Sequence, residues 1–352
     1  MAGINEYIKY YSNYTFSENN FNDVDNLLFS EISYVNWDNI IFDNKKGKKL
    51  SEAISEYETK NKNQTYSKFN ETIAEHVIGI SKTKRFKDIV LSNYVSKIND
   101  EEQFSALTIE YEKGKKYVSF RGTDATIAGW FEDIRMSYSY PVPAQTDAIE
   151  YLNSHFKWDR SKLLVGGHSK GANLAMTAAM YCSESIKKRI KTVYDNDGPG
   201  FRETEFNSKE YQEMSKKLIP ILPEDSVVGR LMYFPQNYKV VKSTEKNIMA
   251  HDITTWKCFG SFVEEGEFSE FSELADKKIM KIFIDYTDEE KEEMVTNFFG
   301  IFTDLGVKRL SDIKKIDFKI ITSTIDKIKG IKPDVRTLYF DVFKDIIRLE
   351  KK

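Results

Sequence analysis

The sequence predicts an α/β protein with a central sheet whose middle strands run parallel. Short apolar runs that are typical of buried strands begin after residue 86, and helical patterns alternate with the later runs. In residues 163–181, one such run passes through a glycine-rich turn directly into an Ala- and Met-rich helical segment. The 352-residue chain is 40% hydrophobic, which suffices for one large domain or for a core domain with a smaller one.

Periodicity assigns the elements in chain order. We expect helices over residues 21–34, 50–57, 70–80, 146–156, 172–181 and 208–217, with Asn22 or Asp23 capping the first. We expect strands over residues 89–95, 104–111, 116–120, 163–165, 191–196, 217–222 and 238–243. A hairpin turn at Gly114-Lys115 joins two of these strands, and Gly129–Ile134 opens a helix or an ordered loop.

Beyond about Glu264 the strand patterns stop, and amphipathic helices with Lys- and Glu-rich faces are expected over 268–286, 288–305, 310–329 and 335–349. We therefore predict an α/β domain over residues 1–262, which includes the N-terminal helices. A helical C-terminal region over residues 263–352 is expected to pack on it.

Composition narrows the function classes. A net charge of −3 provides no basic field for nucleic acid. Two cysteines, Cys182 and Cys258, are too few for a disulfide scaffold or a Cys-rich metal site. No apolar run approaches membrane-spanning length, and residues 1–6 lack the pattern of a signal peptide, so we expect a cytoplasmic protein. Peripheral contact of an aromatic-rich face with a membrane stays open, and the sequence carries no signal for an oligomeric state.

Ser169 is the candidate nucleophile. It is the serine of a G-x-S-x-G pattern, Gly167-His168-Ser169-Lys170-Gly171, between the predicted strand and helix. A serine on such a sharp turn is strained and exposed, and small neighbours let the backbone and a substrate approach closely. The pattern alone is weak, but the strand–turn–helix context favours a nucleophile over an ordinary turn.

A serine nucleophile needs a base and an acid that orients the base. In this arrangement the chain order is Ser, then Asp or Glu, then His, and His251 is the only histidine after Ser169. We favour Asp225 as the acid because it follows a predicted strand end, and Asp197, in a Gly/Pro turn one strand earlier, is the alternative. His76 and His155 are interpreted as structural, and His168 is not expected to be the base because it points away from the adjacent serine on the turn.

An oxyanion hole needs two backbone or side-chain donors. The N–H group of Lys170, the residue after the nucleophile, is the first candidate. Thr123 follows the predicted strand 116–120 and is the second, with its hydroxyl as a further donor. A capped β-turn over Arg121–Asp124 is an equally good interpretation of that stretch.

Several stretches together resemble the class 3 lipase branch of the α/β-hydrolases, and within it most closely the bacterial Mbeg1-like family, long described as a domain of unknown function. The matching stretches are FNDVDNL (21–27), FRGTD (120–124), GWFED (129–133), GGHSKGANLA (166–175), NDGPGF (196–201) and HDITTW (251–256). The resemblance covers most of the chain. It implies a three-layer α/β/α hydrolase fold with Ser169 as nucleophile, Asp225 as acid, His251 as base and Thr123 as oxyanion donor. Lys170 replaces the apolar residue of many lipases.

The function expected from these observations is a serine hydrolase that cleaves a carboxylic ester, a lipid or another acyl ester, without a metal or organic cofactor. A thioesterase, an amidase or a phospholipase would use the same triad. A hydrolase fold that serves only as a binding module is the non-catalytic alternative.

Overall fold

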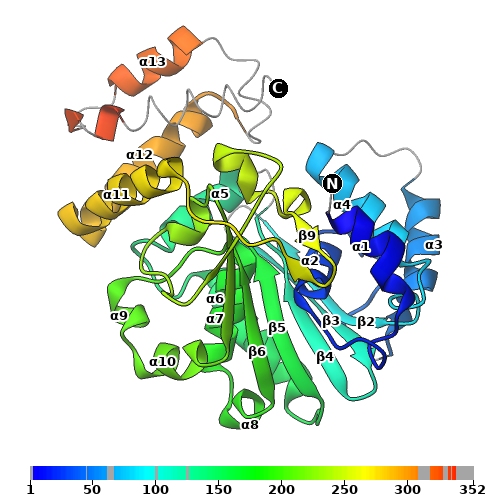
Figure 1. The fold of residues 1–352 in the computed structure, drawn as a ribbon. Helices are drawn as coiled ribbons and strands as arrows, with labels where there is room; N and C mark the ends of the chain where they lie inside the picture. The colour runs from blue at the N-terminus through cyan, green and yellow to red at the C-terminus, as the bar shows by residue number, and fades with distance from the viewer. Residues whose placement is uncertain are drawn as a thin grey trace. The chain divides into compact units, whose positions relative to one another are not determined.

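The computed structural model describes residues 3–44, 46–61, 67–99, 102–123, 127–307, 318–327, 332–333 and 335–337 (Figure 1). The predicted helices over 310–329 and 335–349 therefore lie partly outside the described residues. The chain divides into two compact units. The first comprises Met1–Ile98, Phe104–Gly122 and Pro143–Met280, and the second comprises Asn99–Gln103, Thr123–Val142 and Lys281–Lys352.

The central sheet has eight strands whose order in space equals their order in the chain. They are β1 Lys48–Lys49, β2 Val90–Ile98, β3 Gln103–Glu112, β4 Lys115–Phe120, β5 Lys162–His168, β6 Ile190–Asn196, β7 Leu218–Pro223 and β8 Lys239–Val241. Strands β4 to β8 are parallel, whereas β1 pairs antiparallel with β2 and β3 pairs antiparallel with β4. This confirms the predicted α/β class with a mostly parallel sheet.

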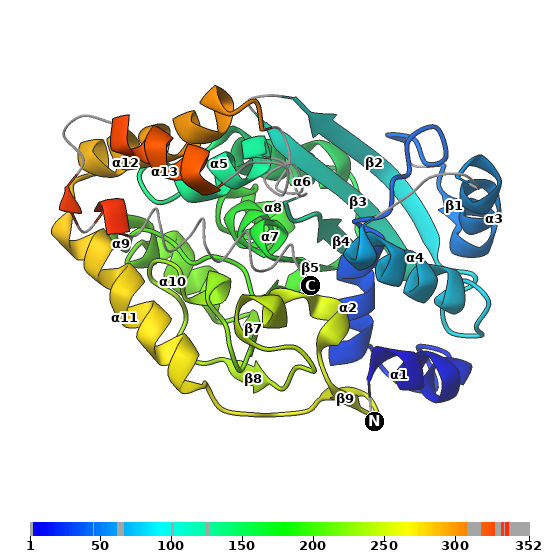
Figure 2. The same cartoon turned by 90° about the horizontal axis from the view of Figure 1, so that it is seen from above.

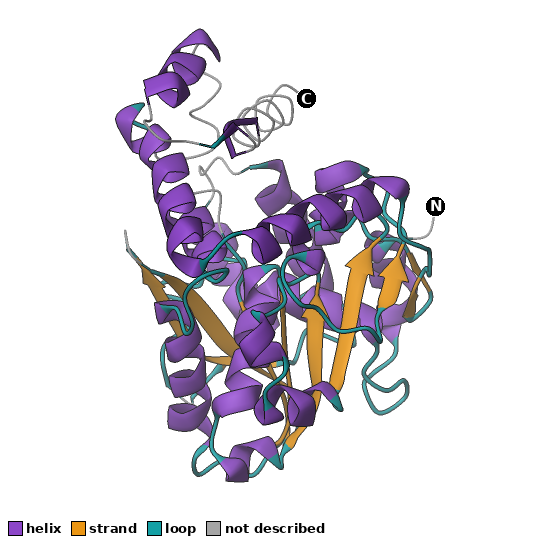
Figure 3. Ribbon diagram, turned by 90° about the vertical axis from the view of Figure 1, so that its left-hand side faces the viewer, coloured by secondary structure: helices purple, strands orange, loops and turns teal. Residues whose placement is uncertain are grey.

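Helices cover both faces of this sheet (Figures 1 and 2). On one face lie α1 Ile4–Tyr10, α2 Asp23–Ile32, α3 Leu50–Lys60 and α4 Lys68–Ile80. The crossovers of the parallel strands contain α6 Pro143–Phe156, α7 Lys170–Tyr181, α8 Glu184–Lys187, α9 Glu203–Phe206 and α10 Lys209–Ser215. Strands β4 to β8 follow one another across the sheet in chain order. Right-handed crossovers between such strands place all of their helices on one face, opposite the N-terminal helices. The colours of Figure 3 separate the strands from the two helical layers.

The strand that follows β7 is shorter than the strand predicted over residues 238–243. Residues 239–241 form strand β8, and the chain then makes two 3₁₀ helices, η3 Asn247–His251 and η4 Ile253–Thr255. A small hairpin of β9 Cys258–Phe259 and β10 Phe262–Val263, which the periodicity did not predict, follows. Helix α11 Glu270–Asp285 comes next.

The second unit contains α5 Ile127–Arg135, α12 Asp288–Asp304 and α13 Phe318–Lys327. Within it, Phe131 of α5 packs edge to face on Phe299 of α12, with ring centroids 5.2 Å apart. Thr287 and Glu290 form a capping box that fixes the start of α12. No described helix is long and apolar enough to cross a membrane.

Helix α2 is buried along its whole length. Asn22 caps it, as predicted, and a capping box with Asp25 completes its first turn. The Asp25 carboxylate also accepts hydrogen bonds from Arg85, at 2.8 Å from Nε, and from Tyr7 Oη at 2.7 Å. Arg85 in turn donates to four main-chain carbonyls of residues 14–20. This buried ion pair ties α1, α2 and the loop before β2 into one layer.

Replacing Arg85 by Met should lower the free energy of unfolding by about 3–5 kcal/mol, because it leaves the Asp25 carboxylate buried without its cation. Urea denaturation of the full chain measures this. Asp88→Ala is the control, since Asp88 pairs with Lys49 where both side chains are half exposed, and should cost less than about 1 kcal/mol. Equal losses in the two variants would contradict the assignment.

Candidate active site

Ser169 lies at the sharp turn between β5 and α7, as the sequence predicts. Its backbone has φ 58° and ψ −135°, a conformation that L-residues rarely adopt and that costs about 1–3 kcal/mol. Its N–H group donates to the carbonyl of Asn196 at 3.0 Å, which ties the turn to the end of the neighbouring strand β6. The residue is 9% exposed. The turn at the carboxyl edge of the sheet is therefore strained, as expected, but Ser169 is buried and not exposed as the sequence pattern predicted.

The glycines on either side of Ser169 are required by close backbone contacts. A Cβ atom on Gly171 would lie 2.1 Å from the carbonyl oxygen of Phe120, the last residue of β4. A Cβ on Gly167 would lie 2.4 Å from the same oxygen. Neither backbone can shift without separating β4 from β5, so larger residues are excluded at both positions.

His251 forms its side-chain hydrogen bond with Asp197. The distance from its Nδ1 to Asp197 Oδ2 is 2.6 Å. Asp197 follows β6, has a φ of 52° and has no exposed surface. Its other oxygen, Oδ1, accepts from Ser226 Oγ at 2.5 Å and from the Gly229 N–H at 3.1 Å. A carboxylate held this way stabilises the imidazole with its hydrogen on Nδ1 and leaves Nε2 to accept a proton.

The prediction that Asp225 orients His251 is wrong in its geometry. Asp225 Oδ2 accepts from the Asn247 N–H at 2.5 Å, and Oδ1 accepts from the hydroxyl of Ser269. Both oxygens thus hold the start of η3 and the segment before α11. The tight Gly/Pro turn that counted against Asp197 is what directs its carboxylate back across the end of the sheet. Asp197, the alternative acid, occupies the place next to the imidazole.

His168, the residue before Ser169, contacts His251. Its Nε2 lies 2.7 Å from the carbonyl oxygen of His251, and the two rings are 4.5 Å apart at 32°. Its Nδ1 lies 2.9 Å from the hydroxyl of Tyr34. Burial, and then the nearby His251, hold the pKa of His168 well below its ordinary value, so the ring is neutral.

Two asparagines that the sequence interpretation left aside fix the turns of the site. Asn173 of α7 donates to the carbonyls of Pro199 and Gly200 at 3.0 and 2.9 Å, which anchors the turn that carries Asp197. Asn196 donates to the Gly167 carbonyl at 2.9 Å and exchanges hydrogen bonds with Asn26 of α2. An amide inside an Ala-rich buried helix was the available signal for Asn173.

The structure places the two predicted oxyanion donors, Lys170 and Thr123, in different compact units. Lys170 is the first residue of α7, and its side chain is fully buried. Its N–H group lies at the positive end of the helix dipole. The Thr123 hydroxyl donates to Asp133, and Thr123 belongs to the second unit whereas Ser169 belongs to the first, so its role remains a prediction.

The remaining histidines are placed as predicted. His76 Nδ1 pairs with the buried Glu31 carboxylate at 2.9 Å, and His155 Nε2 pairs with Asp43 at 2.6 Å.

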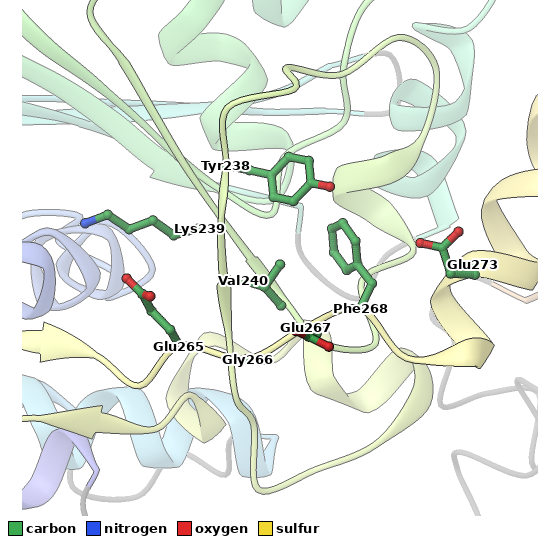
Figure 4. Close-up of a pocket in the computed structure, with 8 residues that line it drawn as sticks. All are labelled: Tyr238, Lys239, Val240, Glu265, Gly266, Glu267, Phe268 and Glu273. Atoms are coloured by element: carbon green, nitrogen blue, oxygen red, sulfur yellow. The ribbon is translucent and has the colours of Figure 1, made fainter.

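Among the described residues, no group of three or more His, Cys, Asp or Glu side chains could hold a metal ion. Figure 4 shows a pocket of about 420 Å³ beside β8 that none of Ser169, Asp197 and His251 lines.

Asp195, two residues before Asp197, is also buried. Its Oδ1 accepts from the Gly198 N–H at 2.8 Å, and burial raises its pKa to about 8. The group is therefore protonated at neutral pH, which avoids a second negative charge near Asp197.

The contribution of Asp195 to the free energy of unfolding should consequently fall as pH rises from about 4 to about 8, because unfolding then releases the Asp195 proton. In urea denaturation, the free energy of unfolding of Asp195→Asn minus that of the wild type should rise by up to about 1.4 kcal/mol per pH unit in that range. For Asp88→Asn, the pKa of Asp88 is lowered by its hydrogen bond to Lys49, so no gain is expected above about pH 5. A pH-independent difference for Asp195→Asn would contradict the assignment.

Two solved structures of fungal lipases are among those that match part of the chain. The Rhizomucor miehei lipase propeptide complex matches with a TM-score of 0.34 and 16% identity over 58% of this chain and 67% of that one. Lipase II from Rhizopus niveus matches with a TM-score of 0.34 and 16% identity over 53% and 76%. At these values the likeness carries nothing about substrate or activity. No curated protein matches the chain.

The model of one protein family, described as Mbeg1-like, matches residues 80–300. This segment is more than half of the chain and runs from the end of α4 into α12. It contains the Ser169 turn, Asp197 and His251 together with the glycines and asparagines that support them. The chain therefore belongs to the Mbeg1-like family.

Proposed function

We propose that the protein is a serine hydrolase that cleaves carboxylic esters through an acyl-enzyme, with Ser169 as nucleophile, His251 as base and Asp197 as the acid. The observation that carries the proposal is the 2.6 Å hydrogen bond between His251 and the fully buried Asp197. His251 contacts His168, the residue immediately before the strained Ser169 turn. A positive-φ serine between glycines that touch backbone has no structural advantage over a glycine, which supports a chemical role.

The steps follow from these positions. Ser169 Oγ attacks the ester carbonyl carbon while its proton passes to Nε2 of His251. The tetrahedral oxyanion receives the Lys170 N–H, with Thr123 proposed as the second donor. Collapse expels the alcohol, which takes the proton from His251. Water then attacks the acyl-enzyme with His251 again as base and releases the acid. Asp197 stays ionised and holds the imidazole tautomer.

Within the described part of the chain, the Ser169 hydroxyl forms no hydrogen bond. Catalytic hydrogen bonds of this kind commonly tighten only when substrate is bound. The substrate we propose is an acyl ester, including lipid esters.

Ser169→Ala should abolish labelling by a fluorophosphonate probe and ester turnover while leaving the circular dichroism spectrum and the unfolding midpoint intact. The probe forms a bond only to an activated serine, so wild-type labelling reports the nucleophile directly. Unlabelled, folded wild-type protein would instead favour the non-catalytic binding module. A panel of esters, thioesters, amides and phospholipids then identifies the bond that is cleaved.

Asp197→Asn should lower kcat by about 10³- to 10⁴-fold, because an amide favours the wrong imidazole tautomer. Asp225→Asn is the matched control: the side chain is also buried, but its oxygens hold η3 and Ser269. It should retain activity within about 10-fold, since an amide oxygen can still accept from Asn247. The reverse ranking of the two variants in steady-state kinetics would restore Asp225 as the acid.

A further inference from the structure

The ring of His168 is clamped between the N-terminal helical layer and the segment that carries His251. It is 2% exposed and closes β5 immediately before Ser169. One nitrogen faces the Tyr34 hydroxyl, two residues beyond α2, and the other faces the main-chain carbonyl of His251. The proposed triad uses the side chain of His251 but not its carbonyl, the His168 ring or the Tyr34 hydroxyl.

The partners of His168 determine its tautomer. A carbonyl oxygen can only accept, so Nε2, at 2.7 Å from the His251 oxygen, carries the hydrogen. A second hydrogen on Nδ1 would make a buried cation beside His251. Nδ1 is therefore the acceptor and the Tyr34 hydroxyl is the donor, at 2.9 Å.

The contact falls where the base needs support. His251 is the last residue of η3, a five-residue 3₁₀ helix that Asp225 holds only at its first residue, and Met249 in the same helix is 40% exposed. Asp197 holds the imidazole, but rotation of the backbone at residue 251 would still swing the ring. The His168 N–H fixes that backbone from the nucleophile's own strand. The neutral ring 4.5 Å away also adds no charge repulsion when His251 takes up the serine proton.

We propose that His168 is a positioning residue that, oriented by the Tyr34 hydroxyl, holds the backbone of His251 so that its Nε2 faces Ser169. The inference rests on the proposed function of Ser169 and His251. It assigns to the residue before the nucleophile a role separate from the triad, and to Tyr34 the choice of its tautomer.

The kinetic test compares three variants with the wild type. His168→Leu removes the donor and should lower kcat by about 10- to 100-fold, the usual cost of a displaced catalytic group, with little change in KM. His168→Gln can present an amide N–H near the position of Nε2 and should recover most of the loss. Tyr34→Phe should fall between them. His155→Leu is the control, because the His155 ring bonds to Asp43 and to the Tyr151 carbonyl on α6, away from the proposed triad, and should leave kcat unchanged.

Imidazole ¹⁵N NMR of the full chain tests the same claim without turnover. His168 should carry its hydrogen on Nε2 between about pH 6 and 8, and Tyr34→Phe should weaken that preference. The His251 ring signals should change in His168→Leu and return towards wild type in His168→Gln.

A wild-type His168 protonated on Nδ1, or His251 signals unaltered by His168→Leu, would overturn the inference. Wild-type protein without probe labelling would defeat the proposed function alone, since the NMR result stands apart from it. If His168→Leu does not fold, His168→Gln and Tyr34→Phe decide the question by the same signals.

Discussion

The carboxylate of Asp197 is the group on which the site depends. It has no exposed surface, so it must be satisfied by protein donors, and it receives three of them from two separate segments. Ser226 and Gly229 come from the loop after β7, and His251 comes from η3. Removing any one of these donors leaves the buried charge without one of its hydrogen bonds, which costs free energy. The segments are therefore held in fixed positions relative to one another. Because burial keeps the nearby Asp195 neutral, Asp195 does not add a second negative charge beside Asp197.

The N-terminal helices belong to the same construction. The Asp25–Arg85 pair holds helix α2 in place. Asn26 of α2 exchanges hydrogen bonds with Asn196 of β6, which in turn donates to Gly167 of β5. Just beyond α2, Tyr34 contacts the ring of His168. A layer that covers one face of the sheet thus also supports the Ser169 turn and, through His168, the backbone of His251.

Much of the fold followed from local patterns because these patterns have local causes. The capped helix at Asn22, the strand–turn–helix at Ser169 and the parallel strands between helices all arise from residues that are close in sequence. The short strand β8, the 3₁₀ helices and the β9–β10 hairpin escaped prediction, since their few residues leave no periodicity to detect. At the site, residue type and order were enough to propose Ser169 and His251, but they did not show that His251 pairs with Asp197 and not with Asp225.

The sequence by itself determined the fold class and the strand–turn–helix at Ser169, and it singled out His251 as the candidate base, because each depends on the order of residue types along the chain. Only the tertiary structure decided which carboxylate meets the imidazole. Both aspartates follow strands, and what separates them is the direction of the side chain: a φ of 52° turns Asp197 towards His251, while Asp225 points to the start of η3. The same holds for His168, whose role depends on a carbonyl 83 residues away in the chain and 2.7 Å away in space.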